Sequence, residues 1–113
     1  MLKTAIYIKR NSFFSRKKIL FKYASEHELN IVKIYKDKPI SRINRAKLLM
    51  HSKTEIFEVV LVYQLSDLDS NPKMQNKIIS LLRKNNVMVV SVKDSITPPK
   101  DEKVFSKDPC IIH

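Results

Sequence analysis

The chain has 113 residues, 43% of them hydrophobic, and it contains no glycine. This length suits one domain with a single core. The glycine-rich loops that cradle dinucleotide or nucleoside-triphosphate phosphates are excluded. Positive φ angles are expected at Asn or Asp, with Asn30, Asn85 and Asn86 at the predicted helix ends. No membrane-spanning run or secretory signal is visible, so a cytoplasmic protein is predicted.

The net charge of +11 lies entirely in the first half of the chain. Residues 1–53 hold 14 Lys or Arg against three acids, whereas residues 54–113 hold eight against eight. Clustered cations bind a polyanion by releasing its counterions, which favours a nucleic-acid partner. A solvated basic surface is the alternative. The candidate anion-binding side chains are Lys9, Arg10, Arg16, Lys17, Lys18, Lys22, Arg42 and Arg45.

Strands and helices are predicted to alternate along the chain. Short apolar runs predict strands over residues 3–8, 31–35, 57–63 and 87–92, and amphipathic spacing predicts helices around residues 19–28, 44–53 and 74–82. The run from Val59 to Val62 is apolar on both faces, which is typical of a sheet covered on both sides. Right-handed crossovers fold this order into a doubly wound α/β domain with a mainly parallel four-stranded sheet and helices on both faces.

The domain is predicted to occupy residues 1–95 and to be followed by a Pro-rich extended or flexible tail, residues 96–113. Pro98, Pro99 and Pro109 disfavour a helix there. Cys110 and His113 also lie in this tail, but two ligands do not complete a metal site. Neither a metal nor a cofactor is predicted.

Three motifs follow predicted strands, where parallel sheets place their sites. They are Tyr7–Asn11, the segment from Asp37 to Arg42 with Arg45 after it, and LSDLDS at residues 65–70. Their order and spacing resemble the catalytic domain of the serine recombinases, the resolvase and invertase family. That family has Y-x-R-x-S, then D-x-x-x-S-G with a nearby Arg, then L-D-R-L-x-R. The resemblance covers residues 3–95 and implies a resolvase-like fold.

The resemblance also implies that a Ser hydroxyl attacks a DNA phosphodiester while Arg side chains hold the phosphate. In an ungapped match Lys9 stands at the first Arg, Asn11 at the nucleophile, Ser66 at the Asp, and Asp67 and Ser70 at two Arg positions. Asp37 and Arg45 are retained. A carboxylate in place of a cation at about 4 Å turns roughly 4 kcal/mol of attraction into repulsion at a dielectric near 20. The sequence therefore predicts a phosphate site that lacks the nucleophile and most of the cations that the resemblance implies.

Three other interpretations of these residues stay open. Ser12 restores R-x-S after a one-residue slip, which would need a bulge at the strand end. Asp67, Asp69 and Asn71 have the alternate spacing of a magnesium-dependent phosphoryl enzyme. The two acids could also simply cap the following helix at the surface.

The sequence thus predicts a non-catalytic serine-recombinase-like domain, not an enzyme, that acts as a binding or regulatory module of a phage or mobile element. The expected partner is a protein, namely a recombinase, another regulator or a second copy. Nonspecific nucleic-acid binding is possible, and no membrane is involved. The alternatives are a basic nucleic-acid-binding protein, or a residual phosphoryl-transfer enzyme that uses Ser12 or a metal at Asp67 and Asp69.

Overall fold

The computed structural model of the protein describes residues 1–9 and 13–98. The strands are β1 (Leu2–Lys9), β2 (Leu29–Asp37), β3 (Val59–Val62) and β4 (Met88–Ser91). The α-helices are α1 (Phe13–Glu26), α2 (Ile43–His51) and α3 (Pro72–Lys84), and the short 3-10 helices are η2 (Ser52–Thr54) and η3 (Leu65–Asp67). Each predicted strand and helix is confirmed; α1 begins six residues before its predicted range, and the other bounds differ by one or two residues.

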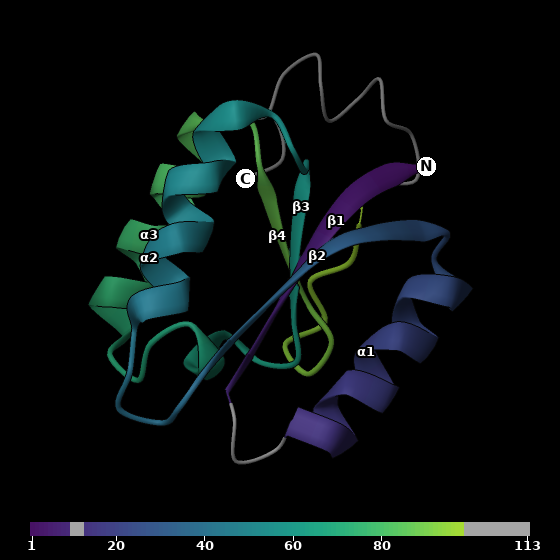
Figure 1. The fold of residues 1–113 in the computed structure, drawn as a ribbon, viewed down its shortest axis with the longest axis horizontal. Helices are drawn as coiled ribbons and strands as arrows, with labels where there is room; N and C mark the ends of the chain where they lie inside the picture. Colours follow the sequence, from purple (N-terminus) through teal and green to yellow (C-terminus); the bar gives the residue numbers. More distant parts are fainter. Residues whose placement is uncertain (10–12, 99–113) are drawn as a thin grey trace.

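The four strands form one parallel sheet in the order β2-β1-β3-β4. Helix α1 covers one face of the sheet, and α2 and α3 lie together on the other (Figure 1). The predicted doubly wound α/β fold is therefore confirmed. The chain winds outward from β1 to β2 and then crosses to β3 on the other side of β1. The carboxyl ends of β1 and β3 thus form the switch point of the sheet, where such folds bind ligands.

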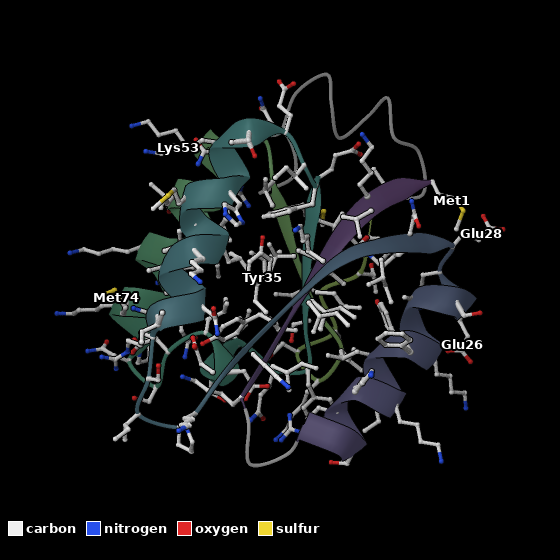
Figure 2. The ribbon with its side chains drawn as sticks, in the orientation of Figure 1. Met1, Glu26, Glu28, Tyr35, Lys53 and Met74 are labelled. Atoms are coloured by element: carbon white, nitrogen blue, oxygen red, sulfur yellow. The ribbon has the colours of Figure 1, made fainter. Side chains whose placement is uncertain are left out.

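Two apolar layers hold the helices to the sheet. On the α2 and α3 side, Tyr7 of β1 packs with Tyr35, Leu48 and Leu82. Figure 2 shows Tyr35 in the interior between α2 and the sheet. On the α1 side, Ile6 and Ile8 of the same strand pack with Leu20, Ala24 and Leu61. Successive side chains of a strand point to opposite faces, so β1 contributes to both layers.

The expectation that Asn or Asp would supply the positive φ angles is correct only for Asn86. The non-glycine residues with positive φ in the part of the chain that the structure describes are Glu28, Glu55, Asn86 and Ser95. Asn30 lies within β2, and Asn85 has a φ of −93°. The left-handed conformation costs a residue with a Cβ only about 1–2 kcal/mol. Glu28, Glu55 and Asn86 follow the ends of α1, η2 and α3, so the position at which a helix ends decides which of them adopts it, whereas Ser95 follows β4.

The described part of the chain continues past β4 to residue 98, and Ile96 forms an antiparallel bridge with Ser91. The rest of the predicted tail, with Cys110 and His113, lies outside the described residues. The division into a domain of residues 1–95 and a tail of residues 96–113 stays a prediction. Among the described helices, none has the length and apolar character to cross a membrane.

Candidate functional site

A polar cleft of about 370 Å³ lies at the switch point of the sheet. The residues that line it are Lys9, Arg16, Pro39, Arg42, Gln64, Ser66, Asp67, Asp69 and Ser70. They come from the end of β1, from α1, from the loop after β2 and from the segment after β3. Three of these side chains are cationic and two are anionic, so the lining carries a net charge of +1.

Asp37, at the end of β2, holds the start of α2. Its Oδ2 accepts hydrogen bonds from the Tyr7 hydroxyl at 2.8 Å and from the backbone N–H of Arg45 at 2.9 Å, and its Oδ1 accepts from the backbone N–H of Asn44 at 2.9 Å. Arg42, at the N-cap of α2, makes no side-chain cap. The buried carboxylate therefore satisfies donors that a capping residue would otherwise satisfy. Burial and the hydrogen bond to Asp37 raise the pKa of Tyr7.

Arg45 is tied to the segment after β3. Its Nη1 donates to Asp69 Oδ2 at 2.8 Å and to the Leu68 carbonyl oxygen at 2.9 Å, and its side chain is only 13% exposed. Asp69 Oδ1 also accepts from the backbone N–H of Asn71 at 2.9 Å. The Asn71 N–H and the Arg45 hydrogen bond lower the pKa of Asp69. Arg42 Nη2 lies 3.5 Å from the same carboxylate, but its side chain remains 59% exposed.

Arg16 reaches the cleft from α1. Its Nη1 lies 3.3 Å from Asp67 Oδ2, and its guanidinium carbon lies 3.9 Å from the centre of the Tyr63 ring. The other oxygen of Asp67 accepts from Gln64 Nε2 at 3.2 Å. Arg16 is therefore held between an aromatic face and a carboxylate, both supplied by the strand and loop of β3.

Lys9 forms the cleft wall at the end of β1. Its Nζ donates to the Ser41 carbonyl oxygen at 3.3 Å and lies 5.8 Å from the centre of the Tyr7 ring. Burial lowers the pKa of Lys9, while Asp37 raises it and Arg45 and Arg42 lower it further. This lysine thus points its cation toward the loop that carries Arg42.

The expectation that Asp67 and Asp69 cap the following helix at the surface is wrong. Both residues are buried, at 7% exposure each. Asn71 caps α3 instead, because its side-chain oxygen accepts from the backbone N–H of Lys73 at 2.8 Å. The two carboxylates turn back toward arginines of α1 and α2. Those arginines also offset the repulsion that the sequence predicts for a bound phosphate.

The other candidate residues fall into three groups. Ser66 and Ser70 line the cleft and are exposed. Lys17 lies over the Phe21 ring at 5.6 Å, and Lys18 and Lys22 are exposed elsewhere on α1. Arg10, Asn11 and Ser12 lie outside the described residues. Over residues 1–9 and 13–98, no group of three His, Cys, Asp or Glu side chains is placed to hold a metal ion.

Two residues of the site carry no signal of their own in the sequence, namely Tyr63 and Gln64. They stack on Arg16 and donate to Asp67, respectively. The sequence signal that could have indicated them is their position directly after a buried strand, because parallel sheets place their sites there.

A family model described as the resolvase N-terminal domain matches residues 9–106. The chain belongs to this family. The resemblance in the sequence is therefore confirmed, and the match begins at the last residue of β1 and includes every residue that lines the cleft. Comparison with curated proteins gives no match.

Three solved structures share the fold. The N-terminal catalytic domain of TP901-1 integrase is 22% identical, with a TM-score of 0.75 over 82% of this chain and 78% of that chain. The C-terminal catalytic domain of ISC1926 TnpA, an IS607-like serine recombinase, is 19% identical, with a TM-score of 0.73 over 80% and 70%. A resolvase family site-specific recombinase from Streptococcus pneumoniae is 20% identical, with a TM-score of 0.80 over 99% and 86%.

These findings correct the expectation that the chain is not an enzyme. The family model is that of the resolvase domain, and two of the similar structures are named as catalytic domains, one of an integrase and one of a serine recombinase. The expectation rested on Asn11 at the nucleophile position and Asp67 at an arginine position. Asn11 lies outside the described residues, and Asp67 is paired with a cation of the same cleft. Neither substitution establishes loss of activity.

Proposed function

We propose that the cleft binds a phosphate of the DNA backbone and that the domain takes part in DNA strand transfer as a serine recombinase of the resolvase family. The observation that carries this proposal is the convergence of Lys9, Arg16 and Arg42 on one cleft at the switch point of a parallel sheet. Each cation comes from a different element, so the tertiary fold brings them together. A net charge of +1 on the lining matches the single negative charge of a phosphodiester.

The proposed chemistry is attack by a serine hydroxyl on the phosphorus atom. The serine O–H loses its proton, a serine–phosphate ester bond forms, and the bond from phosphorus to one sugar oxygen breaks. That oxygen takes up a proton and leaves as a free hydroxyl. Guanidinium and ammonium groups that contact the phosphate oxygens stabilise the charge of the transition state.

Ser12 is the proposed nucleophile. It is three residues from Lys9 and four from Arg16, and both of these line the cleft. Among the described residues, Ser66 and Ser70 supply the hydroxyls of the lining, and their participation is one outcome of the test.

DNA binding tests the phosphate site first. The affinity for a short labelled duplex is measured by fluorescence anisotropy over a range of salt concentrations. We expect the affinity to fall steeply with salt. Each phosphate that the protein neutralises contributes about −0.9 to the slope of the logarithm of the binding constant against the logarithm of the salt concentration. Arg42→Gln should weaken binding more than Lys22→Gln, which removes an exposed cation outside the cleft lining. Equal effects of the two variants would show that binding does not use the cleft.

A covalent adduct tests the strand transfer. A library of nicked duplexes of randomised sequence traps the protein on DNA, and mass spectrometry locates the modified serine. We expect an adduct that Ser12→Ala abolishes and that Ser66→Ala and Ser70→Ala leave intact. An adduct on Ser66 or Ser70 would show that this residue, and not Ser12, is the nucleophile. Absence of any adduct would refute the proposed chemistry, whereas the DNA-binding test would still stand on its own.

A further inference from the structure

Each of the two carboxylates that line the cleft is paired with an arginine, and the two pairs differ in tightness. Arg45 and Asp69 are 2.8 Å apart, and Arg45 also donates to a backbone carbonyl. Arg16 and Asp67 are 3.3 Å apart, which exceeds the 2.7–2.9 Å that is usual for a charge-assisted hydrogen bond. The Arg16 side chain is also more exposed, at 20% against 13% for Arg45. Arg45 is therefore a fixed part of the framework, whereas Arg16 is more loosely engaged.

Arg16 has a second support that does not depend on Asp67. Its guanidinium lies 3.9 Å from the centre of the Tyr63 ring, a distance well within the range of cation–π attraction. The contact with Asp67 engages Nη1, and a guanidinium carries five N–H donors in all. The stacked arginine can therefore change its anionic partner while Tyr63 keeps it at the cleft wall.

Asp67 likewise has a partner besides Arg16. Its Oδ1 accepts from Gln64 Nε2 at 3.2 Å, whereas Oδ2 faces Arg16. A carboxylate with this second contact keeps a hydrogen bond when another anion takes Arg16. Exchange of one anion for another at the guanidinium thus leaves no buried charge without a hydrogen-bond partner, which would otherwise be costly.

We propose that Arg16 is a phosphate-binding residue of the cleft and that Asp67 is its internal counter-ion, which a DNA phosphate displaces from the guanidinium. This inference rests on the proposed function of the cleft and names how its affinity for DNA is regulated. Asp67 lowers the affinity of the free protein for any phosphate, because the incoming anion competes with a carboxylate that is already in place. Only a phosphate that also reaches Lys9 and Arg42 gains enough contacts to replace it.

A double-mutant cycle in the full chain tests this competition. The variants are Asp67→Asn, Arg16→Gln and the combination of both, and the readout is anisotropy with the labelled duplex. We expect Asp67→Asn to bind DNA about fivefold more tightly. This factor corresponds to the attraction between two unit charges about 4 Å apart in water, which the phosphate no longer has to replace. Arg16→Gln should weaken binding by a similar factor. In the combined variant, Asp67→Asn should no longer tighten binding, because the arginine for which the two anions compete is gone.

Two matched controls separate this local effect from net charge and from misfolding. Glu26→Gln makes the same charge change as Asp67→Asn, at the far end of α1 (Figure 2), and it should tighten binding much less. Lys22→Gln is the matched control for Arg16→Gln on the same helix. A thermal melt verifies that each variant is folded. If Asp67→Asn does not fold, the role of Arg16 is tested by comparing Arg16→Gln with Lys22→Gln. Equal weakening of DNA binding by these two variants would overturn that role.

The outcomes distinguish this inference from the proposed function. If Arg42→Gln weakens DNA binding but Asp67→Asn binds no more tightly than wild type, Asp67 is not a competing counter-ion and the inference is overturned. If Asp67→Asn tightens binding equally in the presence and in the absence of Arg16, the effect acts through another group, which also overturns it. If wild type binds no DNA even at low salt, the proposed function itself fails.

Discussion

Replacement of Asp37 by Asn should destabilise the domain strongly although it changes the side-chain volume very little. The carboxylate is 3% exposed and accepts three hydrogen bonds, from the Tyr7 hydroxyl and from the backbone N–H groups of Asn44 and Arg45. An amide has only one oxygen. If that oxygen takes the Oδ2 position it keeps two of the three bonds, and its NH₂ group then faces the N–H of Asn44 as donor against donor.

The expected cost follows from this lost acceptor. A hydrogen bond to a charged group contributes about 1.5–3 kcal/mol, and a buried donor left without a partner costs about 1–3 kcal/mol more. We expect Asp37→Asn to lower the free energy of unfolding by about 3 kcal/mol, which corresponds to a fall in Tm of about 10–20 °C for a domain of this size.

Urea unfolding followed by circular dichroism measures this change. The midpoint should move to lower urea while the slope m stays the same, since the native and unfolded states expose unchanged areas. Glu26→Gln, an exposed carboxyl-to-amide change on α1, serves as the control and should lie within about 0.5 kcal/mol of wild type. A loss of under 0.5 kcal/mol for Asp37→Asn would refute the idea that this carboxylate holds the start of α2.

Three further outcomes are expected from the same structure. Leu82→Ala should cost about 2–5 kcal/mol of unfolding free energy because Leu82 is fully buried, whereas Leu81→Ala at its 38% exposed neighbour should cost under about 1 kcal/mol; comparable urea midpoints would contradict this. The pKa of Asp69 and of Asp94 is lowered in the folded state, chiefly by the Asn71 N–H and by the Ser91 hydroxyl. Their contribution to stability is present above the unfolded value of about 3.9 and is lost as the pH falls through the folded pKa, so Asp94→Asn should flatten the fall in urea midpoint below about pH 4. Because the pKa of Tyr7 is raised in the folded state, its contribution to stability is present below about pH 10 and is lost as the pH rises above that value. In an alkaline absorbance titration, Tyr7→Phe should remove the last tyrosine to ionise.

The fold could be predicted because its signals are local. A strand buried on both faces needs consecutive apolar residues, and Val59–Val62 supplies them in four adjacent positions. The alternation of such runs with amphipathic segments leaves few topologies, because crossovers between parallel strands are right-handed. The same patterns placed Lys9, Asp37 and the segment after β3 at one edge of the sheet, since the carboxyl ends of parallel strands meet there.

The pairing of charges across the cleft could not be predicted in this way. Arg16 and Asp67 are 51 positions apart, and Arg45 and Asp69 are 24 apart. Whether a carboxylate opposes a phosphate or holds an arginine depends on differences of about 1 Å in the position of charged groups, since Coulomb energy varies as the inverse of distance. The sequence by itself determined the parallel α/β domain, the recombinase family and the edge at which its site lies. Only the tertiary structure decided that its two unexpected acids face cations from α1 and α2, because the packing of those helices against opposite faces of the sheet sets every such distance.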